Sequence, residues 1–270
     1  MTLERISKRF IERHPLDTVR IVERLADAEK AALVASLDPK VAAGILQAMP
    51  PADAVSAITP MTPSQSISIF QELSANFAAG CLRRMPVDLR RRILNEAEQN
   101  GELKNVRTLL YFPSGMVGAV MDPETAAVQE QMTAGEAVAF ARRYPEKLRN
   151  IIFVVNGENV LTGMIEARDL LLLNDNMPIK SSTKPIQYKL NSRASLDASK
   201  DNIGWNHLDV MPVVDYHGIY LGGLTRESFL QALTETDTGD FYGDQPKDIL
   251  IGLAETFLNT CSELLFPNKK

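Results

Sequence analysis

Apolar residues recur every twelve positions through the first third of the chain. A leucine or a methionine stands at each step of this series: Leu25, Leu37, Met49, Met61, Leu73 and Met85. Pro39, Pro51 and Pro63 keep the same interval. Twelve residues are too few for a repeat of two helices, and they do not match the seven-residue period of a coiled coil. The pattern therefore predicts one short helix and its turn in each unit.

The residues around each proline are typical of helix starts. Asp38 precedes Pro39 as an N-cap residue precedes the first helical position, where a missing N–H group costs nothing. Thr62 and Gln65 have the spacing of a capping box. Helices of this length are marginal alone in water, so we expect them to stack into a superhelical layer. Four units carry a small residue five positions after the leucine or methionine: Ala42, Ala54, Ser66 and Ala78.

Beyond Glu102 the apolar positions take the spacing of strands, and glycine and proline become common. Ile151–Val155 is a run of five apolar, mostly β-branched residues, which predicts a buried strand. Leu161–Ile165 predicts a second strand that pairs back on the first across a turn at Asn156-Gly157. Ala126–Val128 is expected to form a further strand.

Helices are expected between and after these strands. Thr133 has the position of an N-cap, with Glu136 three residues later, and Arg168–Leu173 begins the second helix. The resulting order, β-α-β-β-α, is followed by a second and less regular copy. The elements expected in that copy are strands at 186–190, 210–214 and 220–224 and helices at 192–203 and 227–233.

Length and charge narrow the classes of function. A chain of 270 residues is long enough for two modest domains with cores of their own. The formal net charge is −5, and neither half has the basic excess expected of a nucleic-acid-binding protein. Arg83, Arg84 and Arg90–Arg92 form a local basic cluster. We interpret it as a solvated helix face, with the anchoring of acidic groups of the second domain as the alternative.

The cysteines and the apolar runs indicate a cytoplasmic chain. Cys81 and Cys261 each lie on an apolar helical face, which fits a reduced interior better than a disulfide framework. Residues 1–15 form a charged amphipathic pattern without the apolar core of a signal peptide. Ile249–Phe266 is the best candidate for a membrane span, but polar residues interrupt it. We expect no membrane-spanning segment.

The sequence contains no recognisable set of candidate catalytic residues. His14, His207 and His217 are scattered and lack the spacing of zinc ligands. A glycine-rich phosphate loop, a nucleophile elbow and a catalytic triad are all absent from the pattern. We therefore expect that the protein is not an enzyme.

The two halves together resemble a known family. Pro212-Val213-Val214-Asp215 and the Gly163–Asp169 stretch are similar to cystathionine-β-synthase (CBS) domains. The array of short helices resembles the N domain of the MgtE magnesium transporters. Tyr111–Met121 is similar to a degraded form of the segment that leads into the first CBS domain of that family. The chain thus resembles the cytosolic region of MgtE and lacks its transmembrane domain.

The resemblance implies an α + α/β fold with four parts. A right-handed superhelix of short helices on the twelve-residue repeat occupies 1–112. A tandem CBS-domain pair follows at 113–178 and 179–236, and an acidic linker with a C-terminal amphipathic helix at 237–270. That last helix takes the place of the family's connecting helix. We expect it to pack on its own domain or on a second subunit, with docking to a membrane partner as the alternative.

Adenine nucleotides are one ligand that the resemblance implies. CBS domains hold them through a Gly-x-x-[Ser/Thr]-x-x-Asp pattern, in which the hydroxyl meets phosphate and the Asp meets ribose. The first copy keeps Asp169 but has Glu166 where phosphate approaches, and like charges oppose each other there. The second copy keeps the hydroxyl of Thr225, with Arg226 as a phosphate partner, and has Ser228 in place of the Asp. The candidate nucleotide-binding residues are Asp169, Thr225 and Arg226, for AMP or ATP.

Magnesium is the other implied ligand. In MgtE, Mg²⁺ lies between acidic surfaces of the N domain and the CBS pair and locks a closed, transport-inactive state. Hard cations take oxygen ligands, and Mg²⁺ keeps several waters while few carboxylates bind it. Our candidate metal ligands are Glu158 and Asp215, which follow buried strands, and Asp169, which begins a helix. The N domain is poorer in acid than the family norm.

Three functions stay open. The first is a non-catalytic regulatory or sensor module that binds a divalent cation between the N domain and the CBS pair and acts through a separately encoded membrane transporter. The second is an adenine-nucleotide-responsive CBS regulatory protein, and the third is a structural protein-interaction module. CBS pairs commonly associate as flat dimers, so a homodimer through the CBS pair is expected under all three, with no nucleic-acid partner.

Overall fold

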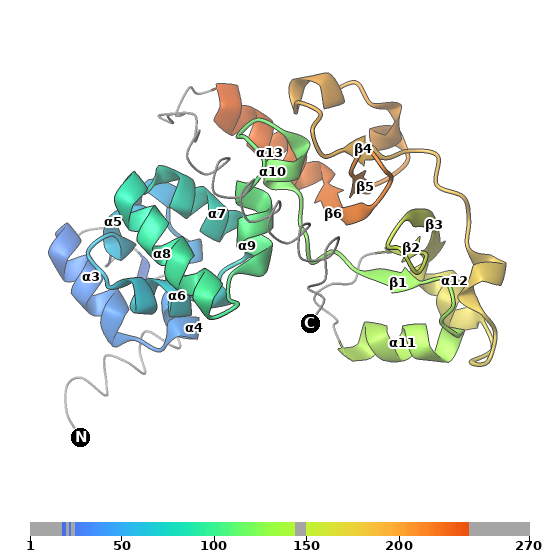
Figure 1. The fold of residues 1–270 in the computed structure, drawn as a ribbon, viewed down its shortest axis with the longest axis horizontal. Helices are drawn as coiled ribbons and strands as arrows, with labels where there is room; N and C mark the ends of the chain where they lie inside the picture. The colour runs from blue at the N-terminus through green and yellow to red at the C-terminus, as the bar shows by residue number, and fades with distance from the viewer. Residues whose placement is uncertain (1–17, 20–21, 23–24, 144–149, 238–270) are drawn as a thin grey trace, which may run out of the picture. The chain divides into compact units, whose positions relative to one another are not determined.

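Six consecutive helices begin twelve residues apart, as the repeat predicts. In this computed structural model, which describes residues 18–19, 22, 25–143 and 150–237, they are α3 (Asp27–Ser36), α4 (Pro39–Gln47), α5 (Pro51–Ile58), α6 (Pro63–Glu72), α7 (Ala75–Arg84) and α8 (Val87–Gln99) (Figure 1). Each helix packs on the second helix along the chain, from α3 on α5 to α6 on α8. Such neighbour-to-neighbour burial is what stabilises helices this short.

The repeated leucine or methionine stands two positions before the first residue of each helix. Met49, Met61, Leu73 and Met85 are buried there. The small residue that follows five positions later is fully buried in every unit that has one, which are Ala42, Ala54, Ser66 and Ala78. A hydrophobic staple joins these two positions at the start of a helix. The twelve-residue interval therefore repeats the same packing contact at the start of each helix.

Both predicted caps are confirmed. The Asp38 carboxylate accepts a hydrogen bond from the Lys40 N–H at 3.1 Å. Thr62 Oγ1 accepts from the Gln65 N–H at 3.4 Å, while Gln65 Oε1 accepts from the Thr62 N–H at 3.1 Å. Each cap satisfies donors that the first turn of a helix leaves unpaired.

Two short helices, α9 (Lys104–Leu110) and α10 (Val117–Val120), connect the array to the strand-containing half. Helix α9 packs on both α7 and α10. Gly118 lies directly against the Phe112 ring, where an added Cβ would stand only 2.6 Å from a ring carbon. Glycine is therefore required at this close approach of the two segments.

The strand-containing half holds two three-stranded sheets of the same topology. The first contains β1 (Ala127–Gln129), β2 (Ile151–Val155) and β3 (Leu161–Glu166), and the second contains β4 (Leu190–Asn191), β5 (Val210–Val214) and β6 (Tyr220–Thr225). In each sheet the first two strands are parallel and the last two antiparallel. Strands β5 and β6 begin 59 residues after β2 and β3 respectively, so the second copy repeats the first at a constant offset.

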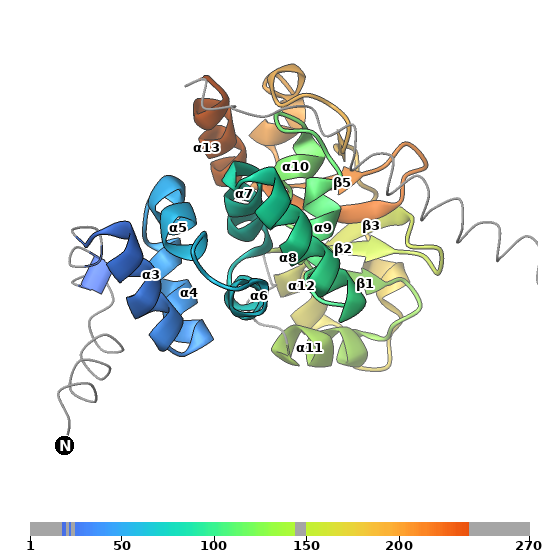
Figure 2. The same cartoon turned by 60° about the vertical axis from the view of Figure 1, so that its left-hand side comes forward.

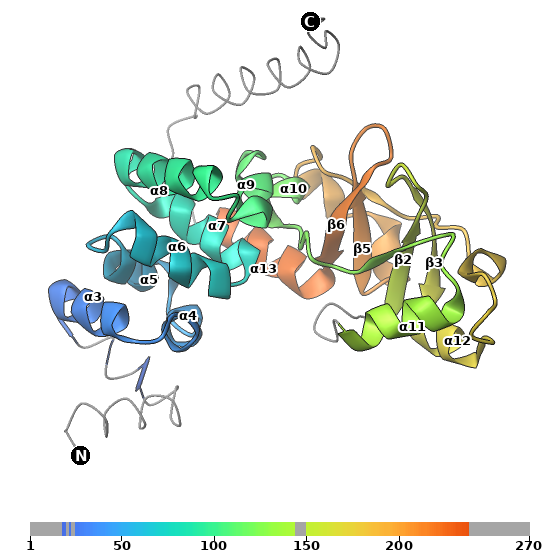
Figure 3. The same ribbon diagram turned by 60° about the horizontal axis from the view of Figure 1, so that its bottom comes forward.

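Three more helices complete the two copies. Helices α11 (Ala134–Arg143) and α12 (Ala167–Leu172) pack on one face of the first sheet around a core that includes Ile152 and Leu170 (Figure 2). Helix α13 (Arg226–Asp237) follows β6 in the second copy (Figure 3). The expected helix cap at Thr133 is confirmed, because its N–H donates to Glu136 at 2.8 Å.

One residue outside each copy extends the sheet of that copy. Lys184, which precedes β4 of the second copy, pairs with Met164 of β3 through hydrogen bonds of 2.8 and 2.9 Å. Asp122, which precedes β1 of the first copy, pairs in the same way with Gly223 of β6. Met164 and Gly223 are equivalent under the offset of 59 residues, so the two bridges lie at the same position of β3 and β6. Each copy therefore depends on a segment that belongs to the other, and we expect the pair to fold as one unit.

Two expectations for the second copy are wrong. Of the strand expected at 186–190 only Leu190 is in a strand, and the helix expected at 192–203 is replaced by turns and a 3₁₀ segment, Asp197–Ser199. The reason is that the backbone of 192–196 bonds elsewhere. The Ser192 N–H donates to Val214, and the carbonyl groups of Ser192 and Ala194 accept from residues 118 and 117.

The array and the second copy share a continuous hydrophobic core. Phe112, Val117 and Met121 belong to it together with Trp205 and Phe229, whose rings stack at 4.8 Å. Cys81 is fully buried in the same core, and burial raises the pKa of its thiol to about 12. The N-terminal amphipathic pattern, Cys261 and the apolar stripe at 249–266 lie outside the described residues. No helix among the residues that the structure describes has the length and apolar character needed to cross a bilayer.

Candidate functional site

The motif of the first copy ends β3 and begins α12, where four charged side chains meet. Lys184 Nζ donates to Glu166 Oε1 at 2.8 Å and to Asp169 Oδ2 at 2.9 Å. Arg168 contacts the other oxygen of each carboxylate, Glu166 Oε2 at 2.8 Å and Asp169 Oδ1 at 3.6 Å. The two acids and two bases thus form a closed ring, which we call the copy-1 charge ring. It lies beside a pocket of about 240 Å³ lined by Asn150, Glu166, Ala167 and Arg168.

The ring shifts the ionisation of its members. Hydrogen bonds from Lys184 hold the pKa of Glu166 and of Asp169 below their ordinary values. The same two hydrogen bonds raise the pKa of Lys184. All three groups are therefore charged at neutral pH, and each carboxylate already has two cationic partners.

The motif of the second copy is arranged differently. The Thr225 hydroxyl accepts from the Ser228 N–H at 3.1 Å and donates to the Ser228 hydroxyl at 2.9 Å, so it caps α13. Arg226 Nη1 donates to the Trp205 carbonyl at 3.3 Å, and the Arg226 N–H donates to the Asp209 carbonyl at 2.9 Å. A nucleotide phosphate at this place would have to share both side chains with these partners.

Two candidate metal ligands lie on adjacent hairpin turns. Asp215 follows β5, and its Oδ1 accepts from the N–H groups of His217 and Ile219 at 2.9 and 2.8 Å. Glu158 lies in the turn after β2, which is built in the same way by Asn156. The turns are joined because the side chain of Asn159 donates to the Tyr220 carbonyl at 2.9 Å.

The structure does not bring the three candidate metal ligands together. Asp169 belongs to the copy-1 charge ring, whereas Asp215 shapes a turn with its carboxylate. Among the described residues, no group of three or more His, Cys, Asp or Glu side chains has the arrangement of a metal site. The predicted set thus does not form a ready-made cation site in this part of the chain, and Glu158, Asp169 and Asp215 stay individual candidates.

Arg83 has a role that differs from the solvated helix face expected for its arginine cluster. Its guanidinium is not on a solvated face but donates to the backbone carbonyls of Leu109 at 2.7 Å, Phe112 at 3.2 Å and Ala119 at 3.4 Å. Burial, followed by the charges of neighbouring arginines, lowers its pKa to about 10. Arg83 therefore ties α7 to the ends of α9 and α10, through carbonyl groups rather than acidic groups.

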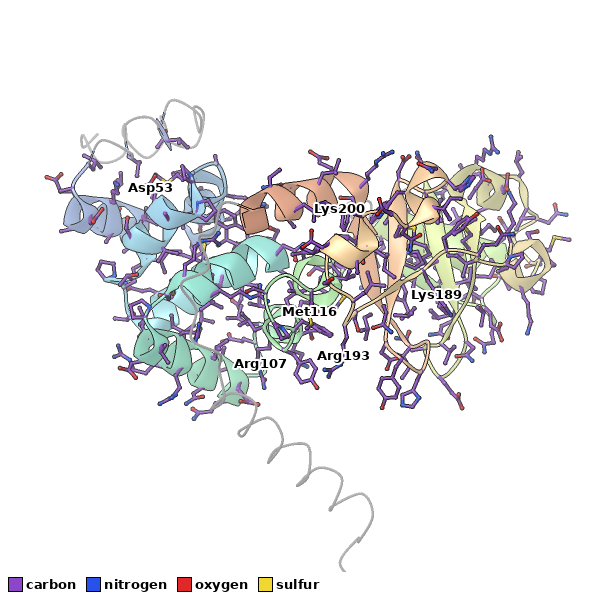
Figure 4. All side chains as sticks on the ribbon, turned by 90° about the horizontal axis from the view of Figure 1, so that it is seen from above. Asp53, Arg107, Met116, Lys189, Arg193 and Lys200 are labelled. Carbon is purple, nitrogen blue, oxygen red and sulfur yellow. The ribbon has the colours of Figure 1, made fainter. Side chains whose placement is uncertain are left out.

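The segment that leads into the first copy is also tied to the second copy. The N–H groups of Val117 and Gly118 donate to the carbonyls of Ala194 and Ser192 at 2.9 and 2.8 Å. The Arg193 guanidinium donates to the Tyr111 hydroxyl at 2.9 Å (Figure 4). Together with Arg83, these bonds connect the helical array to the second copy through residues 109–121.

Family comparisons agree with both halves of this architecture. Residues 13–115 match the model of the MgtE intracellular N domain, and residues 117–174 match that of the CBS domain. The magnesium transporter MgtE of Thermus thermophilus is 27% identical over 139 residues, which are 51% of this chain and 31% of that protein. MgtE of Enterococcus faecalis is 24% identical over 149 residues, 54% of this chain and 32% of that protein. The chain matches about a third of the length of these relatives.

Solved structures show the same fold. The cytosolic domain of the Mg²⁺ channel MgtE in complex with ATP has a TM-score of 0.68 and 22% identity, over 84% of this chain and 94% of that one. The soluble part of a magnesium transporter has a TM-score of 0.70 and 19% identity, over 87% of this chain and 96% of that one. The expected fold class, a helical N-terminal region followed by a CBS pair, is confirmed.

Proposed function

We propose that this chain, which has the N-domain and CBS fold of the cytosolic region of MgtE magnesium transporters, is a non-catalytic regulatory module of magnesium transport. One observation carries the proposal: a helical array and a CBS pair follow each other in that order and are joined by a shared core and a bonded junction. Its ligand would be a divalent cation held between the array and the CBS pair, and its place of action the cytoplasm.

The bonds between the array and the second copy support a role in transmitting a change in how these two parts are arranged. The backbone bonds between residues 117–118 and 192–194, and the bonds of Arg83, connect the array to the second copy. A ligand shifts such an arrangement only by as much as it binds one state better than the other. A cation that bridges two parts of the chain meets this condition because it binds only when both parts are close.

The cation proposal rests on the resemblance of the whole module and not on a preformed cluster of ligands. Mg²⁺ needs few protein carboxylates, because it retains several of its waters. Glu158 and Asp215 lie on adjacent turns of the CBS pair and would supply that side of the site. Replacement of Glu158 by Gln and of Asp215 by Asn removes both negative charges, and this variant is the test of the cation site.

An adenine nucleotide is the alternative ligand. It is supported by the ATP complex of a protein with the same fold and by the retained hydroxyl and arginine of the second copy, Thr225 and Arg226. Against it stand the internal bonds of these two side chains and the carboxylate of Glu166 in the first copy. A structural interaction module that responds to neither ligand is the third function.

We further propose that the CBS pair forms a homodimer. Leu171 of α12 is 69% exposed and Leu230 of α13 is 53% exposed, and the two positions are equivalent under the offset of 59 residues. The residue before each, Leu170 and Phe229, is buried at 2% exposure. Large apolar side chains exposed at the same position of both copies favour a surface that a second chain covers. A membrane transporter is the proposed partner of the resulting dimer.

Thermal unfolding of the full chain separates the three functions. A ligand that binds only the native state at a hundred times its Kd raises the unfolding free energy by about 2.7 kcal/mol. A rise of the unfolding temperature with MgCl₂, but not with KCl of equal ionic strength, supports the cation function, and the E158Q/D215N variant should reduce that rise. A rise with AMP or ATP alone supports the nucleotide function. Absence of both rises contradicts the first two functions and leaves the interaction module.

A further inference from the structure

The copy-1 charge ring leaves no carboxylate oxygen of Glu166 or Asp169 without a cationic neighbour. Each of the two bases bridges both acids, so that Lys184 contacts Oε1 and Oδ2 while Arg168 contacts Oε2 and Oδ1. Three of the four contacts are between 2.8 and 2.9 Å, and the fourth is 3.6 Å. The ring is therefore neutral as a whole, with two positive and two negative side chains.

Backbone bonds to β3 fix the position of Lys184. Its side chain therefore does not reach the acids by chance. Its N–H and carbonyl both bond to Met164 of β3. The neighbouring Gly163 makes this approach possible, since a Cβ there would stand 2.6 Å from the Lys184 carbonyl oxygen. The β-bridge thus aims the lysine at the carboxylates that end β3 and begin α12.

The second copy carries different groups at every equivalent position. Asp122 takes the place of Lys184 in the bridge to β6, and Thr225 and Ser228 take the places of Glu166 and Asp169. The Asp122 carboxylate bonds within its own turn, to the Glu124 N–H at 2.9 Å and to the Thr125 hydroxyl at 3.2 Å. The charge ring is therefore a feature of the first copy alone among the residues that the structure describes.

We propose that Lys184 is a built-in counter-cation that closes the first CBS copy to charged ligands and so determines that any ligand of the pair binds elsewhere. Its ammonium occupies the place between Glu166 and Asp169 that a metal cation would take. The same lysine and Arg168 each contact both acids, which compete with phosphate for these two cations. This inference goes beyond the proposed function, because it concerns what the first copy excludes and holds whichever ligand the whole chain senses.

Removal of the lysine charge should open the ring to a cation. In the K184M variant the stem of the side chain and the backbone bridge remain, and the ring has a net charge of about −1 at neutral pH. Mn²⁺ is the probe, because its free concentration can be followed by electron paramagnetic resonance. We expect K184M to bind about one more Mn²⁺ per chain than the unaltered protein, with millimolar affinity, as for a site of few carboxylates.

Two matched variants make the cation test specific. K184R retains the positive charge and should bind no more Mn²⁺ than the unaltered protein. K184M/D169N removes one carboxylate and should lose the gain of K184M. The proposal is contradicted if K184M binds no additional Mn²⁺ while its far-ultraviolet circular dichroism is unchanged, or if the unaltered protein already binds Mn²⁺ in a way that D169N abolishes.

Removal of one acid should open the ring to an anion. E166T places a hydroxyl at the position of Glu166 and frees Lys184 and Arg168 from one of their two acidic partners. AMP titrated by calorimetry should then bind at least tenfold more tightly than to the unaltered protein, and E166T/K184M should lose that gain. Equal AMP affinity of E166T and the unaltered protein would overturn the inference. Both tests compare variants with the unaltered chain, so a missing response of that chain to Mg²⁺ contradicts only the proposed function.

Discussion

Replacement of Arg83 by methionine should weaken the connection between the helical array and the CBS pair. Methionine retains much of the apolar stem but removes the donors to the carbonyls of Leu109, Phe112 and Ala119. A hydrogen bond from a charged donor contributes about 1.5 kcal/mol at good geometry, and longer ones contribute less. The 2.7 Å bond and the two longer bonds, at 3.2 and 3.4 Å, then sum to about 2.5 kcal/mol.

Part of this loss is offset because the folded state no longer buries a cation. The lowering of the Arg83 pKa to about 10 by burial indicates that this cost is present. We therefore expect R83M to lower the free energy of unfolding by about 2 kcal/mol. Urea denaturation should show this as a lower midpoint with an unchanged slope. Amide hydrogen exchange should show faster exchange in residues 109–121, since the carbonyls of that segment lose their shared partner.

The matched control is R92M, which removes an exposed arginine from α8 of the same array. It should change the free energy of unfolding by less than about 0.5 kcal/mol, as substitutions away from buried features do. Equal effects of R83M and R92M on stability, or unchanged exchange in residues 109–121, would refute the role that we assign to the buried arginine.

Three further predictions test other parts of the structure. G163A places a Cβ 2.6 Å from the Lys184 carbonyl oxygen, and a thermal melt should show a loss of about 2 kcal/mol or more, because backbone cannot yield as a side chain can. T62A removes a capping box and should cost about 1 kcal/mol in urea denaturation. The pKa values of Glu166 and Asp169 are lowered below 4.5 and 3.8, so their contribution to stability is present above these values and lost as pH falls below them. E166Q/D169N should therefore show a shallower loss of stability in acid than the unaltered chain, measured as midpoint against pH.

The sequence predicts well those elements whose causes are local. Helix starts follow from caps such as Asp38 and Thr62, which bond within three residues of themselves. Strands β2 and β5 follow from short apolar runs, and both have the predicted bounds of 151–155 and 210–214. In each case the residues that decide the structure lie inside the element.

Elements decided by distant partners could not be predicted in this way. Residues 192–196 have a helical pattern but bond to residues 115–118, some 77 positions earlier in the chain. Lys184 and Arg83 act on groups 15 to 36 residues away, so their neighbours give no sign of their roles. Glu158 and Asp215 are candidate ligands because they follow strands, and such positions do not reveal which oxygens a turn already uses.

The most direct test of the regulatory proposal is small-angle X-ray scattering of the full chain with and without Mg²⁺. A cation held between the array and the CBS pair draws the two together, so the radius of gyration should fall as MgCl₂ rises into the millimolar range and stay constant with KCl of equal ionic strength. The E158Q/D215N variant should show a smaller fall. An unchanged radius of gyration in MgCl₂, or an equal change in KCl, would contradict the proposal that this module senses magnesium.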